Sequence, residues 1–151
     1  MSVKKKIYET LAGDWLPTLY KTQVRTGRTR SVHLDIAVRE NKAEILYTLL
    51  GIELKVGRRR FSCPDLATAR YLRVFARIGC REFAIPYDIS QISCIADDLE
   101  TSWQRSLVLT EGKSPDRTAL IKMLRTEINA YGPGDAMPLF DRETKQRKGE
   151  K

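Results

Sequence analysis

One short stretch of strictly alternating residues constrains the fold more than any other. Residues 51–57 read Gly-Ile-Glu-Leu-Lys-Val-Gly, so three apolar side chains are separated by Glu53 and Lys55. Successive side chains of a β-strand point to opposite faces of the sheet. The pattern therefore predicts a strand that buries its apolar residues and presents a carboxylate and an ammonium side by side on its other face.

A second alternating run, residues 32–38, leaves His33 and Asp35 on the face opposite its apolar members. Residues 43–50 lie between the two runs. They are apolar without a clean period and fit either a buried strand or a two-turn helix. The strand interpretation gives an antiparallel hairpin with Asp35 and Glu53 on adjacent strands, where Asp35, Glu53 and Lys55 can converge.

The remaining pattern predicts helices around this sheet. Amphipathic spacing indicates four helices, the first ended or bent by Pro17 and the second ended by Gly79, at about residues 3–20, 62–78, 90–107 and 113–130. The strand expected at 81–87 follows the second helix, which predicts a βαβ unit with this strand parallel to the Glu53 strand. Residues 1–140 are expected to form one domain, and 141–151 a disordered basic tail.

The charge balance favours a polyanionic partner. The chain has 27 Lys and Arg against 19 Asp and Glu, a formal net charge of +8, which points chiefly to nucleic acid. Candidate phosphate contacts come from a basic loop, a run of three arginines and a stripe along the second helix. They are Arg28 and Arg30, then Arg58, Arg59 and Arg60, and finally Arg70, Arg73 and Arg77. The alternative for each group is a solvated surface.

Composition also argues against several other classes of protein. The longest apolar run is too short to span a bilayer, and the lysines at residues 4–6 do not lead into a signal-peptide apolar region. A protein that is cytoplasmic or otherwise intracellular, without a membrane partner, is therefore expected. Cys63, Cys80 and Cys94 form no C-x-x-C pair and His33 is the single histidine, which disfavours a zinc site or a disulfide framework. No P-loop, G-x-G-x-x-G or G-x-S-x-G motif occurs.

The order of the expected elements resembles the restriction-endonuclease-like, PD-(D/E)XK nuclease superfamily. In this resemblance Asp35 is the lone acid and Glu53-Leu54-Lys55 is the E-x-K motif, within residues 3–107. Leu34 stands where the family name has proline. The resemblance implies an α/β fold with a mixed central sheet, an αβββαβ restriction-endonuclease-like core and additional C-terminal helices.

The resemblance also implies a metal-dependent endonuclease that hydrolyses phosphodiester bonds in double-stranded DNA, of the restriction or homing type. Asp35 and Glu53 would hold Mg²⁺ or Mn²⁺, and Lys55 would orient the attacking water or stabilise charge on the phosphate. Glu9 is a possible additional acid. Cutting both strands needs two sites, which predicts a homodimer. The alternatives are a nucleic-acid-binding module without catalysis, and a regulatory protein that engages a partner through its apolar segment 136–140.

Overall fold

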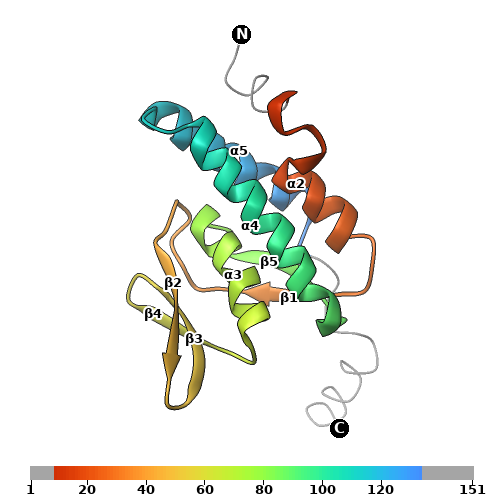
Figure 1. Ribbon diagram of the computed structural model, residues 1–151, viewed down its shortest axis with the longest axis vertical. Helices are drawn as coiled ribbons and strands as arrows, with labels where there is room; N and C mark the ends of the chain where they lie inside the picture. The colour runs from red at the N-terminus through yellow and green to blue at the C-terminus, as the bar shows by residue number, and fades with distance from the viewer. Residues whose placement is uncertain (1–8, 134–151) are drawn as a thin grey trace, which may run out of the picture.

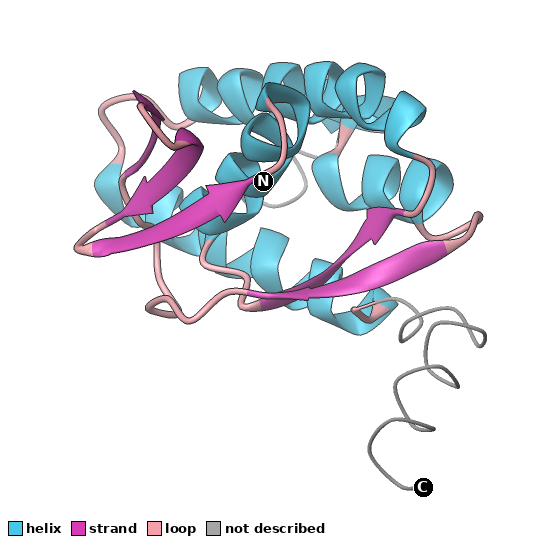
Figure 2. Ribbon diagram, turned by 90° about the horizontal axis from the view of Figure 1, so that it is seen from below, coloured by secondary structure: helices cyan, strands magenta, loops and turns pink. Residues whose placement is uncertain are grey.

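The strands divide into two small antiparallel sheets rather than one (Figure 1). The computed structural model describes residues 9–133; the expected tail at 141–151, the segment 136–140 and the start of the expected first helix lie outside the described residues. The protein is mixed α/β, as predicted. The prediction of a single mixed central sheet is wrong, and Figure 2 shows the two sheets on opposite sides of the molecule with helices lying across both.

Three consecutive strands form the larger sheet: β2 (Ala43–Thr48), β3 (Gly51–Val56) and β4 (Arg59–Cys63). Two tight turns join them, and every pairing is antiparallel. The predicted alternation in β3 is confirmed, since Leu54 and Val56 are buried on the core side. Residues 43–48 are a strand, one of the two interpretations that the sequence allowed.

The smaller sheet pairs β1 (Thr29–His33) with β5 (Glu82–Pro86), and Ser31 lies opposite Ala84. Two predictions fail here. The strand expected at 32–38 ends at His33, so Asp35 follows it, and β5 runs antiparallel to β1 instead of parallel to the Glu53 strand. The βαβ unit is therefore absent from residues 51–86.

The second edge of β5 is occupied by tyrosine side chains. The Ala84 amide donates to Tyr20 Oη at 2.8 Å, and Tyr71 Oη donates to the Ala84 carbonyl at 2.5 Å. Tyr20 Oη in turn donates to the Gly132 carbonyl at 2.6 Å. Because both backbone groups of Ala84 on this side are satisfied, no third strand can pair there.

The N-terminal helical region breaks earlier than expected. The short 3-10 turn η1 (Ala12–Asp14) is followed by extended backbone at Trp15, and α2 (Leu16–Leu19) then continues as the π-helical turn η2 (Tyr20–Val24). Pro17 lies in the first turn of α2, where a missing amide hydrogen costs no helix bond. The break therefore falls at Trp15, and Pro17 belongs to the helix that follows.

The central element is α3 (Leu66–Ile78), which contacts all three strands of the larger sheet, α4 (Ile92–Leu109) and α5 (Ser114–Tyr131). Asp65 caps its start by accepting from the Thr68 amide at 2.7 Å. On its buried side, Phe75 stacks on Phe83 of β5 with ring centroids 4.3 Å apart. The buried apolar residues form one cluster around this helix. No helix in the described part of the chain is long and apolar enough to cross a membrane.

The end of α3 is fixed by the loop that precedes β2. Gly79 ends the helix with φ +94°, as the sequence predicted, and a Cβ at this position would lie 2.3 Å from the Arg39 carbonyl oxygen. Asn41 Nδ2 donates to the carbonyls of Ala37, Arg39 and Ala76 at 2.9, 3.0 and 3.1 Å. The backbone N–H of Asn41 also donates to the Arg77 carbonyl at 3.2 Å. These hydrogen bonds hold the loop at residues 37–41 against the C-terminal end of α3.

Replacing Gly79 by alanine should lower the free energy of unfolding by more than about 2 kcal/mol, because a left-handed backbone alone costs a residue with a Cβ roughly 1–2 kcal/mol and the contact with Arg39 adds to it. Urea denaturation measures the change. Gly112→Ala is the matched control, since Gly112 also has positive φ, +73°, but nothing lies within 4 Å of its added Cβ. Equal losses in the two variants would contradict the role of close packing at Gly79.

Stability should fall in alkaline solution. Burial raises the pKa of Tyr71 well above its ordinary 10.0, and burial raises the pKa of the Cys80 thiol from 9.0 to about 12. The unfolded chain releases these protons at lower pH than the folded protein, so the stabilisation is complete below about pH 9 and is lost as pH rises towards 12. Urea midpoints between pH 8 and 11.5 test this, and Cys80→Ala should make the decline shallower. A flat profile over that range would refute the prediction.

Candidate functional site

The three predicted catalytic residues do not converge. Glu53 and Lys55 share one face of β3, and Arg60, directly opposite Lys55 on β4, shares that face too. Glu53 pairs with Arg60 at 3.4 Å. Asp35 instead accepts from Arg59 at 2.6 Å, and Arg59 lies opposite Val56 on the other face of the sheet. The predicted placement of Asp35 and Glu53 on adjacent strands is wrong, because the strand before Asp35 belongs to the other sheet.

The carboxylates proposed as metal ligands have arginine partners. Asp35 pairs with Arg59 and, at 3.4 Å, with Arg81. Among residues 9–133 no group of three or more His, Cys, Asp or Glu side chains is placed to hold a metal ion. Glu9 is exposed in the helical residues 9–11 that precede η1, and it forms no hydrogen bond or ion pair with Asp35 or Glu53. The donor set of the expected magnesium site is therefore not assembled, and the site stays a prediction.

Two arginines of the predicted phosphate-binding stripe hold α3 to α4. Arg70 donates to Glu100 at 2.6 Å and also pairs with Asp97. Arg73 donates to Glu100 at 2.9 Å. Burial alone would raise the pKa of Glu100, but the hydrogen bonds from the two guanidinium groups outweigh it and hold that pKa below its ordinary value. Acidic side chains of α4 thus pair with two of the stripe's three arginines.

The third member of the stripe lines a cationic hollow. Lys42, Lys55 and Arg77 surround a hollow of about 400 Å³ together with Ala43, Glu44 and Gly57; we refer to it as the Lys55 hollow. None of the three cations has a salt-bridge partner among the described residues. Arg77 Nη2 donates to the Ala43 carbonyl at 3.2 Å, which fixes its guanidinium at the start of β2. Three cations facing one carboxylate make a site suited to an anion.

The Lys55 hollow adjoins two others. A hollow of about 300 Å³ shares Lys42, Ala43 and Arg77 with it and extends to Trp103 and Arg117. Another of about 500 Å³ shares Arg77 and runs along α3 and α4. Burial, followed by the charge of Arg73, lowers the pKa of Arg77. Arg77 lines all three hollows, at the place where α3 meets the start of β2.

A second basic surface lies at the end of the smaller sheet. The guanidinium carbons of Arg28 and Arg30 lie 4.6 and 4.8 Å from the ring centroid of Tyr87. The Tyr87 amide donates to the Arg28 carbonyl at 2.9 Å, which extends the pairing of β1 with β5. Neither arginine forms a salt bridge with a described carboxylate. The sequence identified both cations but not the aromatic ring between them.

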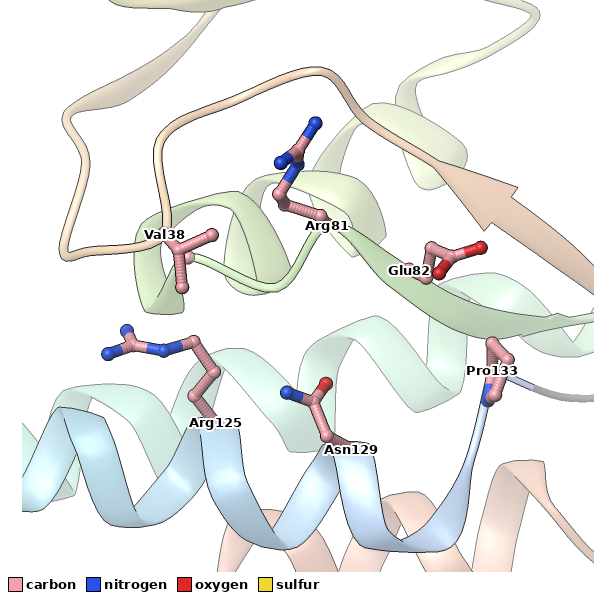
Figure 3. A pocket seen from close by; sticks show the side chains of 7 residues that line it. Val38, Arg81, Glu82, Arg125, Asn129 and Pro133 are labelled. Carbon is pink, nitrogen blue, oxygen red and sulfur yellow. The ribbon is translucent and has the colours of Figure 1, made fainter.

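A further hollow has a volume of about 290 Å³, and Figure 3 shows Arg125 and Asn129 of α5 among the side chains that line it. Glu82 is the first residue of β5 and Arg81 precedes it; Arg81 is already paired with Asp35. Arg125 Nη1 donates to the Ile78 carbonyl at 2.8 Å. Both guanidinium groups therefore have protein acceptors, and this hollow offers an anion fewer free donors than the Lys55 hollow.

Glu100→Gln should lower the free energy of unfolding by about 1–3 kcal/mol, because the charged hydrogen bonds from Arg70 and Arg73 are lost while both guanidinium groups remain. Asp97→Asn is the control: its side chain is 61% exposed, so the change should stay below about 1 kcal/mol. Urea denaturation at neutral pH measures both. A larger loss in the Asp97 variant would show that Glu100 is not the main partner of the stripe.

Comparison with known proteins gave no match to a family model, to a curated protein or to a solved structure.

Proposed function

We propose that this protein is a nucleic-acid-binding module that holds backbone phosphates in the Lys55 hollow. The observation that carries the proposal is that Lys42, Lys55 and Arg77 converge on one hollow with a single carboxylate, Glu44, and that none of the three forms a salt bridge among the described residues. Several other arginines are neutralised by acids, as Arg70 and Arg73 are by Glu100. Here three cations without a salt bridge line one hollow at this end of the larger sheet.

The chemistry of the hollow suits a chain of phosphates. Lysine ammonium groups bind phosphate as point charges, and an arginine held by a backbone carbonyl supplies an oriented donor. Arg58, exposed in the turn directly after Gly57, extends the cationic surface beyond the rim. The formal net charge of +8 supports approach of a polyanion from a distance.

Arg28 and Arg30 beside Tyr87 offer a separate contact for the same class of ligand. Base stacking on an aromatic ring and phosphate contacts from arginine are common in proteins that bind single strands. This surface belongs to the smaller sheet, which lies on the opposite side of the molecule from the larger sheet (Figure 2). Its variants therefore report on a distinct place in the protein.

Lys42→Gln with Lys55→Gln should weaken binding to a fluorescent duplex and reduce the slope of log K against log salt by about 1–2, since each lost phosphate contact changes it by roughly 0.9. Fluorescence anisotropy between 50 and 200 mM salt measures affinity and slope, and circular dichroism checks folding. Lys113→Gln with Lys122→Gln is the control. Both lysines are exposed and do not line the hollow, and their substitution removes the same amount of charge.

Two outcomes would overturn the proposal: no binding to duplex or single-stranded nucleic acid at low salt, or equal weakening by the control pair. Arg28→Gln with Arg30→Gln, in the same assay, reports whether the smaller sheet contributes. The hydrolysis implied by the sequence resemblance stays a prediction. Incubating the bound duplex with Mg²⁺ tests it, and cleavage that persists in Glu53→Gln would remove Glu53 from any catalytic role.

A further inference from the structure

The outer edge of β2 has unused backbone hydrogen-bonding groups. β2 is the terminal strand of the larger sheet, and the tight turn at residues 49–50 fixes Thr48, Leu46 and Glu44 as the residues bonded to β3. The amides and carbonyls of Ile45 and Tyr47 therefore point away from the sheet. Among the described residues they have no hydrogen-bond partner, whereas the Ala43 carbonyl is bonded to Arg77.

This edge lacks the features that normally prevent edge-to-edge pairing. The opposite edge, β4, starts with Arg59 and Arg60, but β2 contains no proline or glycine and only one charged residue, Glu44. Apolar side chains are also exposed beside it: Tyr47 is 72%, Leu49 105% and Leu50 94% exposed. In Figure 1 the turn that carries the two leucines projects below the ends of the neighbouring helices.

The strand is complementary to a second copy of itself. A two-fold axis through Leu46 pairs the strands antiparallel and places Ile45 opposite Tyr47 of the second copy. Because both of these residues direct their backbone groups outwards, the register forms four hydrogen bonds without disturbing β3. If the axis lay between two residues, each residue with outward-facing amide and carbonyl groups would lie opposite a residue whose amide and carbonyl are already bonded to β3.

Side chains and charges agree with this register. Directly opposed residues share a face, so Tyr47 covers the half-buried Ile45 of the second copy, and the two Leu46 side chains meet on the other face. Glu44 lies opposite a threonine, Thr48, so the pairing opposes no like charges despite the net charge of +8. We propose that a second copy of this chain occupies the β2 edge and forms a continuous six-stranded sheet. This inference does not depend on the proposed nucleic-acid binding.

Oligomeric state tests the proposal. Sedimentation equilibrium should show a dimer for the wild-type protein, and Tyr47→Lys should make it monomeric. Tyr47→Pro should do the same, since the amide that it removes points outwards and proline is tolerated on such an edge. Val108→Lys is the control: Val108 is 68% exposed on α4, so this change adds the same charge elsewhere and should leave the dimer intact.

A disulfide tests the register. In a pair that is not hydrogen-bonded, opposed Cα atoms lie about 4.5 Å apart, within the range that a disulfide spans. Leu46→Cys in a Cys94→Ser background should therefore cross-link two copies under mild oxidation, whereas Thr48→Cys should not. A monomeric wild-type protein, a dimer that survives Tyr47→Lys, or cross-linking through Thr48→Cys but not Leu46→Cys would overturn the proposal.

Discussion

Two hydrogen bonds at Ala84 determine how the rest of the molecule is arranged. Tyr20 accepts from its amide at 2.8 Å and Tyr71 donates to its carbonyl at 2.5 Å, so helical segments cover the edge of β5 that another strand would need. Through Gly132, the hydroxyl of Tyr20 also joins the end of α5 to this point. Leaving a buried hydroxyl or peptide group without a hydrogen-bond partner costs free energy, so these bonds stabilise the packing of the helical segments against β5. The larger sheet must then form separately, on the other side of α3.

Local patterns predicted the elements well but not their partners. The alternation at β3 and the Gly79 signal that ends α3 depend on neighbouring residues, and both were found, although α3 starts at Leu66 and not at about residue 62. The alternation at residues 32–38 was also real, since Leu34 and Ile36 are buried and Asp35 is exposed. It continues beyond β1 without a strand partner. Burial periodicity therefore does not reveal which strands pair, and the position of Asp35 relative to Glu53 depended on that pairing.

The candidate site was partly visible in the sequence. Lys55 was singled out, and Arg77 belonged to the predicted stripe, but Lys42 carried no signal because the three cations are separated by more than ten residues along the chain. The sequence shows which residues are cationic but not which of them have acidic partners in the fold. Only the packing of α3 on α4 reveals that Glu100 engages Arg70 and Arg73. Whether an arginine of this stripe has an acidic partner is thus decided by tertiary packing.

The bonds of Asn41 give the Lys55 hollow a thermodynamic link to the fold. Its side chain joins the loop at residues 37–41 to the last turn of α3, and its chain neighbour Lys42 and its bonding partner Arg77 both line the hollow. An anion held between these two cations bridges the same two segments that Asn41 fastens. A ligand that binds only when the loop is packed against α3 stabilises the packed loop, and the packed loop in turn favours binding. Slower hydrogen exchange at this junction would therefore identify a ligand before any activity is known.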